Sequence, residues 1–178
     1  MRLVDTNDCN TAVHVVVLAD THVRSGAHQR LTAPAYDEVA RADVVLHCGD
    51  LVSIDFLEEL GEYAPVHAVL GNNDIGLAEV LPTAMVVDLG GVAVGMVHDA
   101  GPSRRRSERL RARFPTCDVV VFGHSHIPVN EIVDGQLLFN PGSATQRRRQ
   151  PHRTLGVLDI RDGSVVQHEI RVVDAESR

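Results

Sequence analysis

Residues 14–22 read HVVVLADTH, an apolar run that ends in Asp20, Thr21 and His22. A short run this rich in valine predicts a buried strand. The run stops at a carboxylate and an imidazole, which are side chains that bind metals. We therefore expect this strand to deliver functional side chains at its carboxyl end.

Further apolar runs predict strands at residues 43–48, 65–70, 84–89, 92–97 and 118–123. Helix-like segments separate several of them, at residues 34–42, 53–64 and 102–114. In the second of these segments, Ser53 is the expected N-cap, and Ile54, Leu57 and Leu60 share one helical face. Two hairpins with Asp-Gly turns follow, at residues 129–140 and 154–173. Strand–helix alternation followed by hairpins indicates an α/β fold with mixed sheets.

Several of the other runs also end in polar clusters. These clusters are Gly49-Asp50, Gly71-Asn72-Asn73-Asp74, His98-Asp99 and Gly123-His124-Ser125-His126. Ligands of open α/β sheets bind outside the carboxyl ends of the strands, so the clusters are expected to converge there. Residues i and i+2 of an extended chain point to the same side. We therefore expect Asp20 with His22, and His124 with His126, each to aim two side chains at one place.

The side-chain chemistry selects a kind of metal. Carboxylate, imidazole and amide oxygen without thiolate suit manganese, iron, zinc, nickel or cobalt. Seven such ligands are too many for one ion, but they suit two ions that share a carboxylate and lie about 3.5–4 Å apart. The candidate ligands are Asp20, His22, Asp50, Asn72, His98, His124 and His126.

Simpler interpretations exist for single residues. Asp20 fits a helix N-cap, His124 and His126 fit ordinary loop histidines, and Asn72 with Asn73 fits a tight turn. Any one motif occurs by chance. The five clusters together, each placed after a predicted strand, favour the metal site.

The ordered motifs D-x-H, G-D, G-N-x-D, H and G-H-x-H resemble those of the calcineurin-like metallophosphoesterases. The short chain and the later sequence Asn140-Pro141-Gly142-Ser143 resemble the small prokaryotic phosphodiesterases of that superfamily. The resemblance implies a four-layer αββα sandwich of two mixed sheets flanked by helices. It also implies two divalent transition-metal ions, with manganese expected first.

The same resemblance implies a role for each ligand. Asp20, His22 and His126 would hold the first ion, and Asp50 would bridge the two. The second ion would be held by Asn72, His98 and His124. A hydroxide shared by the two ions would attack phosphorus in line with the leaving oxygen, so the implied activity is that of a phosphodiesterase.

Asn73 departs from the commoner family pattern, which has histidine after the metal-binding asparagine. That histidine is thought to protonate the leaving group, and an amide cannot act as a general acid near pH 7. The substitution leaves the metal site intact. It leaves open what protonates the leaving group, and so which esters are natural substrates.

The whole chain agrees with one domain, residues 1–178, with a loose tail over residues 1–10. Its net charge of -7 argues against a broad nucleic-acid or membrane-binding surface. The arginine runs at residues 104–106 and 147–149 fit solvated surface better than substrate clamps. His47 is expected in the core.

Three scattered cysteines, with no signal peptide or membrane span, indicate a cytoplasmic protein. The expected partner is a phosphate-ester substrate, and relatives of this kind commonly form homo-oligomers. The alternative function is a non-catalytic scaffold or protein-binding module, because this fold persists in a retromer subunit without evident catalysis. A scaffold has no reason to keep seven metal ligands, so the enzyme is favoured.

Overall fold

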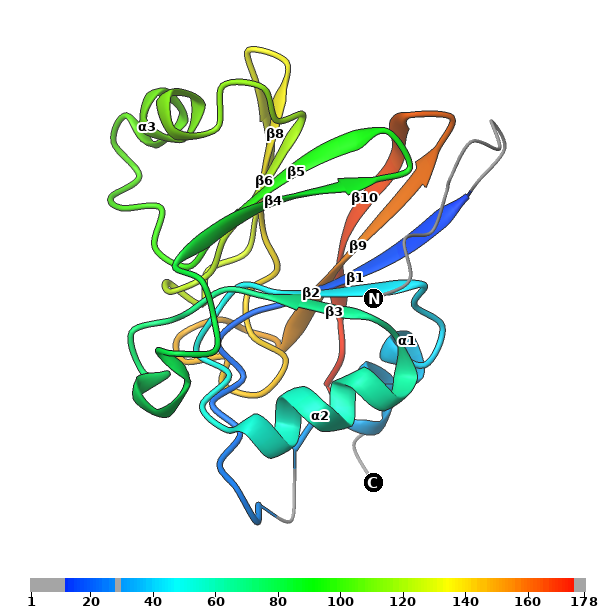
Figure 1. Cartoon of the computed structure of the whole chain (residues 1–178), viewed down its shortest axis with the longest axis vertical. Coiled ribbons are helices and arrows are strands. Elements are labelled where there is room, and N and C mark those ends of the chain that lie inside the picture. Colours follow the sequence, from blue (N-terminus) through cyan, green and yellow to red (C-terminus); the bar gives the residue numbers. More distant parts are fainter. Residues whose placement is uncertain (1–11, 28–29, 175–178) are drawn as a thin grey trace.

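The computed structural model describes residues 12–27 and 30–174 (Figure 1). Two five-stranded mixed sheets face each other, with α1 (Ala33–Val39) and α2 (Ile54–Tyr63) outside one sheet and α3 (Arg106–Arg113) outside the other. The predicted four-layer α/β sandwich is therefore confirmed. The loose tail expected at residues 1–10 lies outside the described residues.

The first sheet has the strand order β10-β9-β1-β2-β3. Strands β1, β2 and β3 run parallel, because α1 and α2 connect them, and the β9–β10 hairpin pairs antiparallel with β1. The bounds are β1 (Val13–Leu18), β2 (Val44–His47), β3 (Val66–Ala68), β9 (Thr154–Arg161) and β10 (Ser164–Val172).

The second sheet has the strand order β4-β5-β6-β8-β7. Its centre, β5-β6-β8, is parallel, and the edge strands β4 and β7 pair antiparallel as halves of hairpins. The bounds are β4 (Ala84–Leu89), β5 (Val92–Val97), β6 (Val119–Val121), β7 (Val129–Val133) and β8 (Gln136–Asn140). A short 3-10 helix, η1 (Ile75–Leu77), precedes β4.

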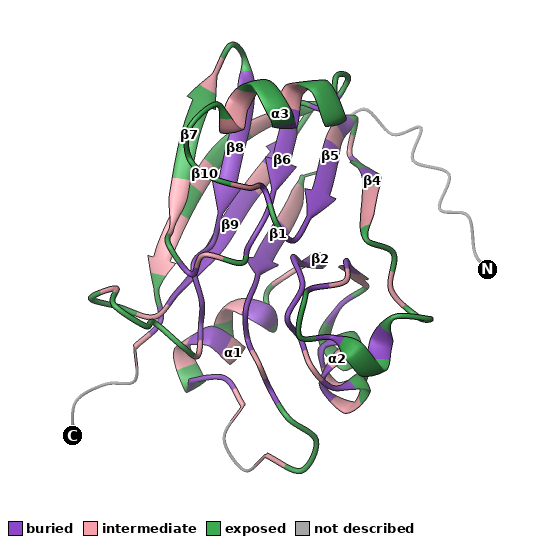
Figure 2. Ribbon diagram, turned by 90° about the vertical axis from the view of Figure 1, so that its left-hand side faces the viewer, coloured by how far each residue is buried: buried purple, intermediate pink, exposed green. Residues whose placement is uncertain are grey.

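From Val15 to Leu18, strand β1 is apolar at every position because both of its faces are buried there. Val15 and Val17 pack between the two sheets, whereas Val16 and Leu18 pack against the layer of α1 and α2. Successive side chains of a strand point to opposite faces, so burial on both sides requires a continuous apolar run. Figure 2 shows the resulting buried strands between the helical layers.

The helices differ from the prediction in detail. Ser53 is the N-cap of α2, but its hydroxyl makes no capping hydrogen bond. The buried residues of α2 are Phe56 and Leu60, and Ile54 is 40% exposed, so the predicted face was wrong at Ile54. Phe56 and Leu60 lie one turn apart, and burying the larger aromatic side chain turns the helix toward this pair.

Helix α3 begins at Arg106 rather than at residue 102. Arg105 precedes it with a φ of 56°, a left-handed conformation that cannot continue a right-handed helix. In the described part of the chain, no helix is both long enough and apolar enough to cross a membrane.

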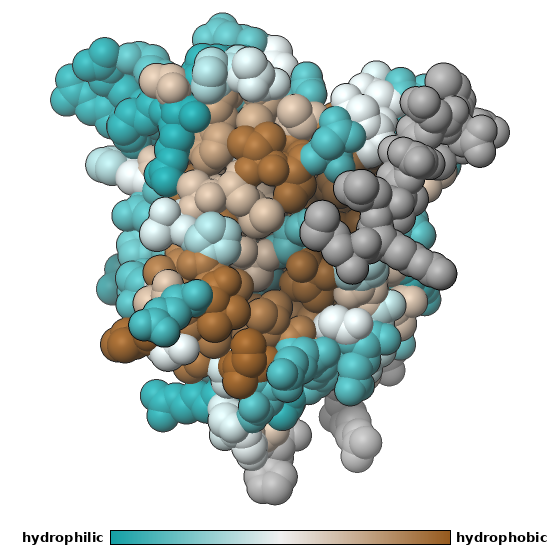
Figure 3. Space-filling view, in the orientation of Figure 1, coloured by the Kyte–Doolittle hydropathy of each residue, from teal (hydrophilic) through white to brown (hydrophobic). Residues whose placement is uncertain are grey.

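The edge beside β4 carries exposed apolar side chains. Ile75, Val80 and Val86 are 87%, 59% and 56% exposed. Figure 3 shows apolar surface over β4 and the segment before it. The homo-oligomer expected from the resemblance stays a prediction.

Candidate metal centre

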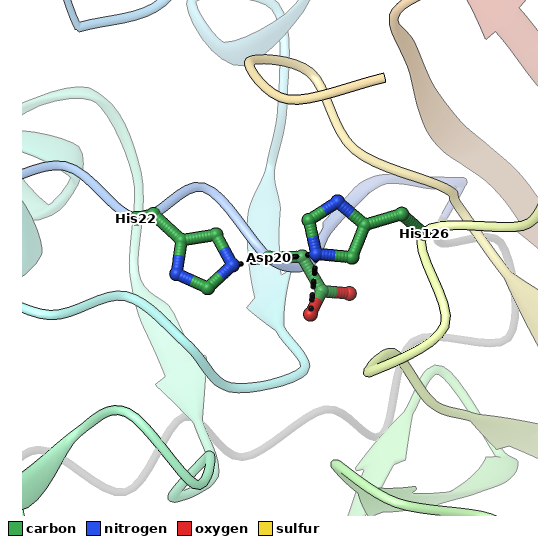
Figure 4. A group of neighbouring side chains, drawn as sticks. All are labelled: Asp20, His22 and His126. Atoms are coloured by element: carbon green, nitrogen blue, oxygen red, sulfur yellow. Dashed lines mark hydrogen bonds and ion pairs between the residues drawn. The ribbon is translucent and has the colours of Figure 1, made fainter. Parts of the chain in front are cut away.

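The loops after β1, β2, β3, β5 and β6 meet at one end of the sandwich, and all seven candidate ligands lie on them. One group consists of Asp20, His22 and His126, whose ligand atoms all lie within 4.8 Å of one another. The Nε2 atoms of His22 and His126 are 3.3 Å apart, and His126 Nε2 is 3.5 Å from Asp20 Oδ1. Figure 4 shows the two imidazoles facing each other beside the carboxylate.

A second group consists of Asn72, His98 and His124. Asn72 Oδ1 lies 3.0 Å from His98 Nε2 and 2.9 Å from His124 Nδ1. The two imidazole nitrogens are 3.3 Å apart. Three ligand atoms thus converge on one place, as they do in the first group.

Asp50 lies between the two groups. Its Oδ2 is 3.7 Å from His22 Nε2 and 3.6 Å from His98 Nε2, so one oxygen is almost equidistant from a ligand of each group. Its two oxygens also accept hydrogen bonds from Asn73, at 2.8 Å from the backbone N–H and 2.6 Å from the side-chain amide. Asn73 therefore orients the carboxylate that joins the groups.

Other hydrogen bonds fix the ligands from behind. Asp74 accepts hydrogen bonds from the backbone N–H groups of Asp50 at 2.8 Å and of Gly71 at 2.7 Å. His98 Nδ1 lies 2.7 Å from the Cys48 carbonyl oxygen, and His126 Nδ1 lies 2.7 Å from the carbonyl oxygen of Gln146. An Nδ1–H that donates to a carbonyl leaves the Nε2 lone pair free for a metal.

Five of the seven ligands have left-handed backbone conformations, with φ between 47° and 69°: Asp20, His22, Asp50, His124 and His126. Each costs on the order of 1 kcal/mol, and such strain clusters at functional sites. The expectation of extended chain at these pairs was therefore wrong. His124 and His126 point into different groups, because the chain turns sharply between them.

Close backbone approach also requires glycine beside Asp50. A Cβ atom placed on Gly71 would lie 2.1 Å from the Asp50 backbone nitrogen. No side chain fits there, and so the loops after β2 and β3 bring Asp50 and Asn72 together only with glycine at this position.

Comparisons with known proteins agree with this arrangement. Residues 13–163 match the calcineurin-like phosphoesterase superfamily domain. The chain belongs to this superfamily. It is 31% identical over 150 residues to the probable metallophosphoesterase MJ0623 of Methanocaldococcus jannaschii, with 82% of this chain and 75% of the relative covered.

Two further proteins are similar to this member of the calcineurin-like superfamily. The phosphodiesterase MJ0936 of Methanocaldococcus jannaschii is 27% identical over 139 residues, which cover 71% of this chain and 81% of the relative. Vps29 of Entamoeba histolytica, in a crystal structure complexed with zinc, has a TM-score of 0.70 and 23% identity over 90% of this chain and 99% of Vps29. The second likeness shows the fold alone.

The electrostatics of the candidate metal centre favour a bound cation. Asp20 is fully buried, and neither of its carboxylate oxygens has a hydrogen-bond partner among the described residues. Burial, and then the charge of Asp50, raise the pKa of Asp20 to about 8. A buried carboxylate needs a partner, and a metal ion is one that fits this carboxylate–imidazole–amide set.

The other ligands are held in the forms that metals bind. Burial lowers the pKa of His126 to about 4 and also lowers the pKa of His22, so both imidazoles are neutral near pH 7. Burial acts to raise the pKa of Asp50, but the two hydrogen bonds from Asn73, together with the neighbouring His98 and His22, outweigh it, and the pKa is lowered. Asp50 is therefore a ready carboxylate ligand.

Removing metal is expected to destabilise the protein. An ion that binds only the folded state adds about 2.7 kcal/mol at one hundred times its Kd. For a chain of this size, that is a fall in Tm of roughly 5–10 °C after EDTA treatment at pH 7.5. The difference should shrink as pH drops, because protons compete for the ligands. Differential scanning fluorimetry measures it, and an unchanged Tm would contradict an occupied site.

His47 lies directly behind the centre and is fully buried, as expected of a core residue. Its Nε2 is 2.9 Å from the Thr21 hydroxyl, and its Nδ1 has no hydrogen-bond partner among the described residues. Burial lowers the pKa of His47 to about 3. The folded protein therefore keeps this imidazole neutral at pH values where the unfolded chain, with a pKa near 6.5, binds a proton.

The unfolded state thus binds more protons than the folded state between about pH 6.5 and pH 3, and His47 makes stability fall as pH falls through that window. The expected slope is up to about 1.4 kcal/mol per pH unit. His47→Gln should flatten the pH dependence of urea unfolding of the metal-free protein between pH 7 and pH 5. His168→Gln, at a partly exposed histidine, is the control. Equal slopes in wild type and His47→Gln would show that His47 is not kept neutral.

Proposed function

We propose that this phosphoesterase is a binuclear metal-dependent phosphodiesterase. The position of Asp50 carries the proposal, because one carboxylate oxygen lies 3.7 Å and 3.6 Å from ligand atoms of two separate groups. That placement suits a carboxylate shared by two ions. Bound there, two divalent ions would polarise the phosphoryl group and supply a strong oxygen nucleophile at neutral pH.

Each ligand group would then hold one ion. Asp20, His22 and His126 would hold the first, Asn72, His98 and His124 would hold the second, and Asp50 would be shared by both. Two carboxylates against two dications leave about two net positive charges, which attract a phosphate ester to an acidic chain.

A diester is favoured over a monoester by a named relative, and Asn73 limits which leaving groups react readily. MJ0936 is named a phosphodiesterase. At the position of the family's general acid, the Asn73 amide donates to Asp50, and so it holds the shared carboxylate instead of protonating a leaving group. Esters with weakly basic leaving groups are therefore the better substrates.

The alternative is a scaffold, for which the fold-level likeness to Vps29 is the supporting observation. A scaffold gains nothing from a fully buried carboxylate without a hydrogen-bond partner or from five strained ligand positions. Those features are explained by a bound cation, on which the proposed reaction depends. We therefore rank the enzyme first.

Hydrolysis of bis(p-nitrophenyl) phosphate tests the function. Protein stripped with EDTA should be inactive, and added Mn²⁺ should restore turnover as metal content rises to two ions per chain. Saturation at one ion would contradict the binuclear site. Metal-replete protein that hydrolyses neither this diester nor p-nitrophenyl phosphate would contradict the enzyme and leave the scaffold.

A further inference from the structure

The loop that follows β8 carries three consecutive arginines and is tied to the metal centre. Ser143 Oγ donates to the Asp20 carbonyl oxygen at 2.8 Å, and Thr145 Oγ1 donates to the Thr21 carbonyl oxygen at 2.7 Å. The Gln146 carbonyl is the hydrogen-bond partner of His126. The loop is therefore fixed beside the first ligand group immediately before the exposed arginines at residues 147–149.

Arg148 and Arg149 line a cavity of about 230 Å³ that has His126 in its wall. Arg148 has a left-handed backbone, with a φ of 50°. The cavity therefore places two guanidinium-bearing side chains beside a ligand of the first group.

This placement is not explained by metal binding. Neither Arg148 nor Arg149 has a hydrogen bond or ion pair from its guanidinium to any residue within 12–27 and 30–174. Two dications and two carboxylates already leave the centre positive, and a further cation beside it weakens metal binding by like-charge repulsion. An anion lying between the arginines and the ions would reverse the sign of that interaction.

The reacting phosphoryl group alone does not account for two arginines. A phosphodiester carries one negative charge, which the ions themselves neutralise. The cavity is larger than one phosphate needs, and Ile127, which is 51% exposed, gives it an apolar wall. Its chemistry suits an organic arm that bears a second anionic group.

Resting on the proposed function, we propose that Arg148 and Arg149 form a subsite for a second phosphate on the arm of the diester beside His126. Guanidinium groups bind phosphate by paired, charge-assisted hydrogen bonds. The substrate class is then a phosphodiester whose organic arm carries an additional phosphate. Two arginines on an acidic chain suit one additional phosphate and not a long polyanion.

Two esters that differ by one phosphate test the subsite. Thymidine 5′-(p-nitrophenyl phosphate) and its 3′-phosphorylated form share the leaving group and the reacting phosphate. With Mn²⁺-loaded wild type, kcat/KM should be about 10-fold higher for the 3′-phosphorylated ester at low salt, the size expected of one partly exposed charge-assisted contact. The ratio should decline toward one at high salt, where exposed charges are screened.

Arg148→Gln should bring the ratio of the two kcat/KM values close to one, and Arg148→Lys should keep part of it. Arg161→Gln removes the same charge at the far end of β9, and it should keep the wild-type ratio. Competitive inhibition gives a readout that does not depend on bond cleavage. Thymidine 3′,5′-bisphosphate should inhibit wild type about 10-fold more strongly than thymidine 5′-phosphate, and Arg148→Gln should lose this difference.

The outcomes separate the subsite from the proposed function. Equal rates for the two esters in wild type would overturn the subsite and leave the phosphodiesterase standing. A preference that survives in Arg148→Gln, or that is lost equally in Arg161→Gln, would overturn the assignment to Arg148. Hydrolysis of neither ester by metal-replete wild type would overturn the proposed function, and the subsite with it.

Discussion

Asp50→Asn is expected to lower kcat/KM for bis(p-nitrophenyl) phosphate at least ~100-fold, the upper end of what loss of a metal-site contact usually produces. Asp50 supplies half of the fixed negative charge among the seven ligands. Its Oδ2 lies within 3.7 Å of both His22 Nε2 and His98 Nε2. An amide lacks the charge and the second equivalent oxygen that a shared ligand needs.

The variant also creates a hydrogen-bond conflict. Asn73 donates hydrogen bonds to both oxygens of Asp50. In the Asp50→Asn variant, one of these oxygens becomes an NH₂ group, which is a donor that faces another donor. We expect the side chain to rotate, which misplaces what remains of the shared ligand. Metal content, measured together with kcat/KM, should fall below two ions per chain.

Asp88→Asn is the matched control, because it removes the same charge at the β4–β5 turn, where Asp88 accepts a hydrogen bond from the Gly91 N–H. It should keep wild-type activity and metal content. If Asp50→Asn also keeps both, Asp50 is not shared between two ions, and the binuclear proposal loses its main support.

The sequence predicted the candidate ligands because each lies directly after an apolar run, a pattern that local reasoning detects. It predicted the wrong backbone, since an isolated D-x-H or H-x-H gives no sign that aspartate and histidine adopt left-handed conformations. Only tertiary contacts stabilise such strain. The division of His124 and His126 between two groups follows from that strain, and the residue spacing does not show it.

The supporting contacts were less predictable. The carbonyl oxygens of Cys48 and Gln146 lie at hydrogen-bond distance from the Nδ1 atoms of His98 and His126. Every residue has a backbone carbonyl, so the residue type does not show which one takes part. The sequence shows that Asn73 takes the place of the family's histidine, but it does not show that Asn73 binds Asp50, because this hydrogen bond joins residues 23 positions apart. The arginines at residues 147–149 looked like solvated surface for the same reason, as their place beside His126 depends on the folded loop.

Asp20→Asn is expected to change stability in opposite directions without and with metal. In the metal-free protein, the Asp20 carboxyl has a pKa of about 8, above the ordinary value of 3.8. The folded state therefore holds this proton more tightly than the unfolded state does. The stabilising contribution is complete below about pH 3.8 and is lost as pH rises through 8.

Above pH 8, wild type without metal must bury a carboxylate that has no hydrogen-bond partner, at a cost of several kcal/mol. Asparagine has nearly the same shape and carries no charge. Metal-free Asp20→Asn should therefore melt roughly 5–10 °C above metal-free wild type at pH 8.5, and the two should approach each other at pH 5. Fluorimetry of EDTA-treated proteins measures both differences.

Addition of Mn²⁺ should reverse the order, because the cation becomes the missing partner of the Asp20 carboxylate. Wild type should gain several degrees in Tm at pH 8.5, whereas Asp20→Asn should gain little, since it lacks a charged ligand of the first group. Asp88→Asn should follow wild type in both conditions.

A metal-free Asp20→Asn protein less stable than wild type at pH 8.5 would show that the buried carboxylate is not a source of strain. If Mn²⁺ raises the Tm of Asp20→Asn as much as it raises the Tm of wild type, Asp20 is not a metal ligand. The reversal itself is what a site that sacrifices stability in order to bind a cation should show.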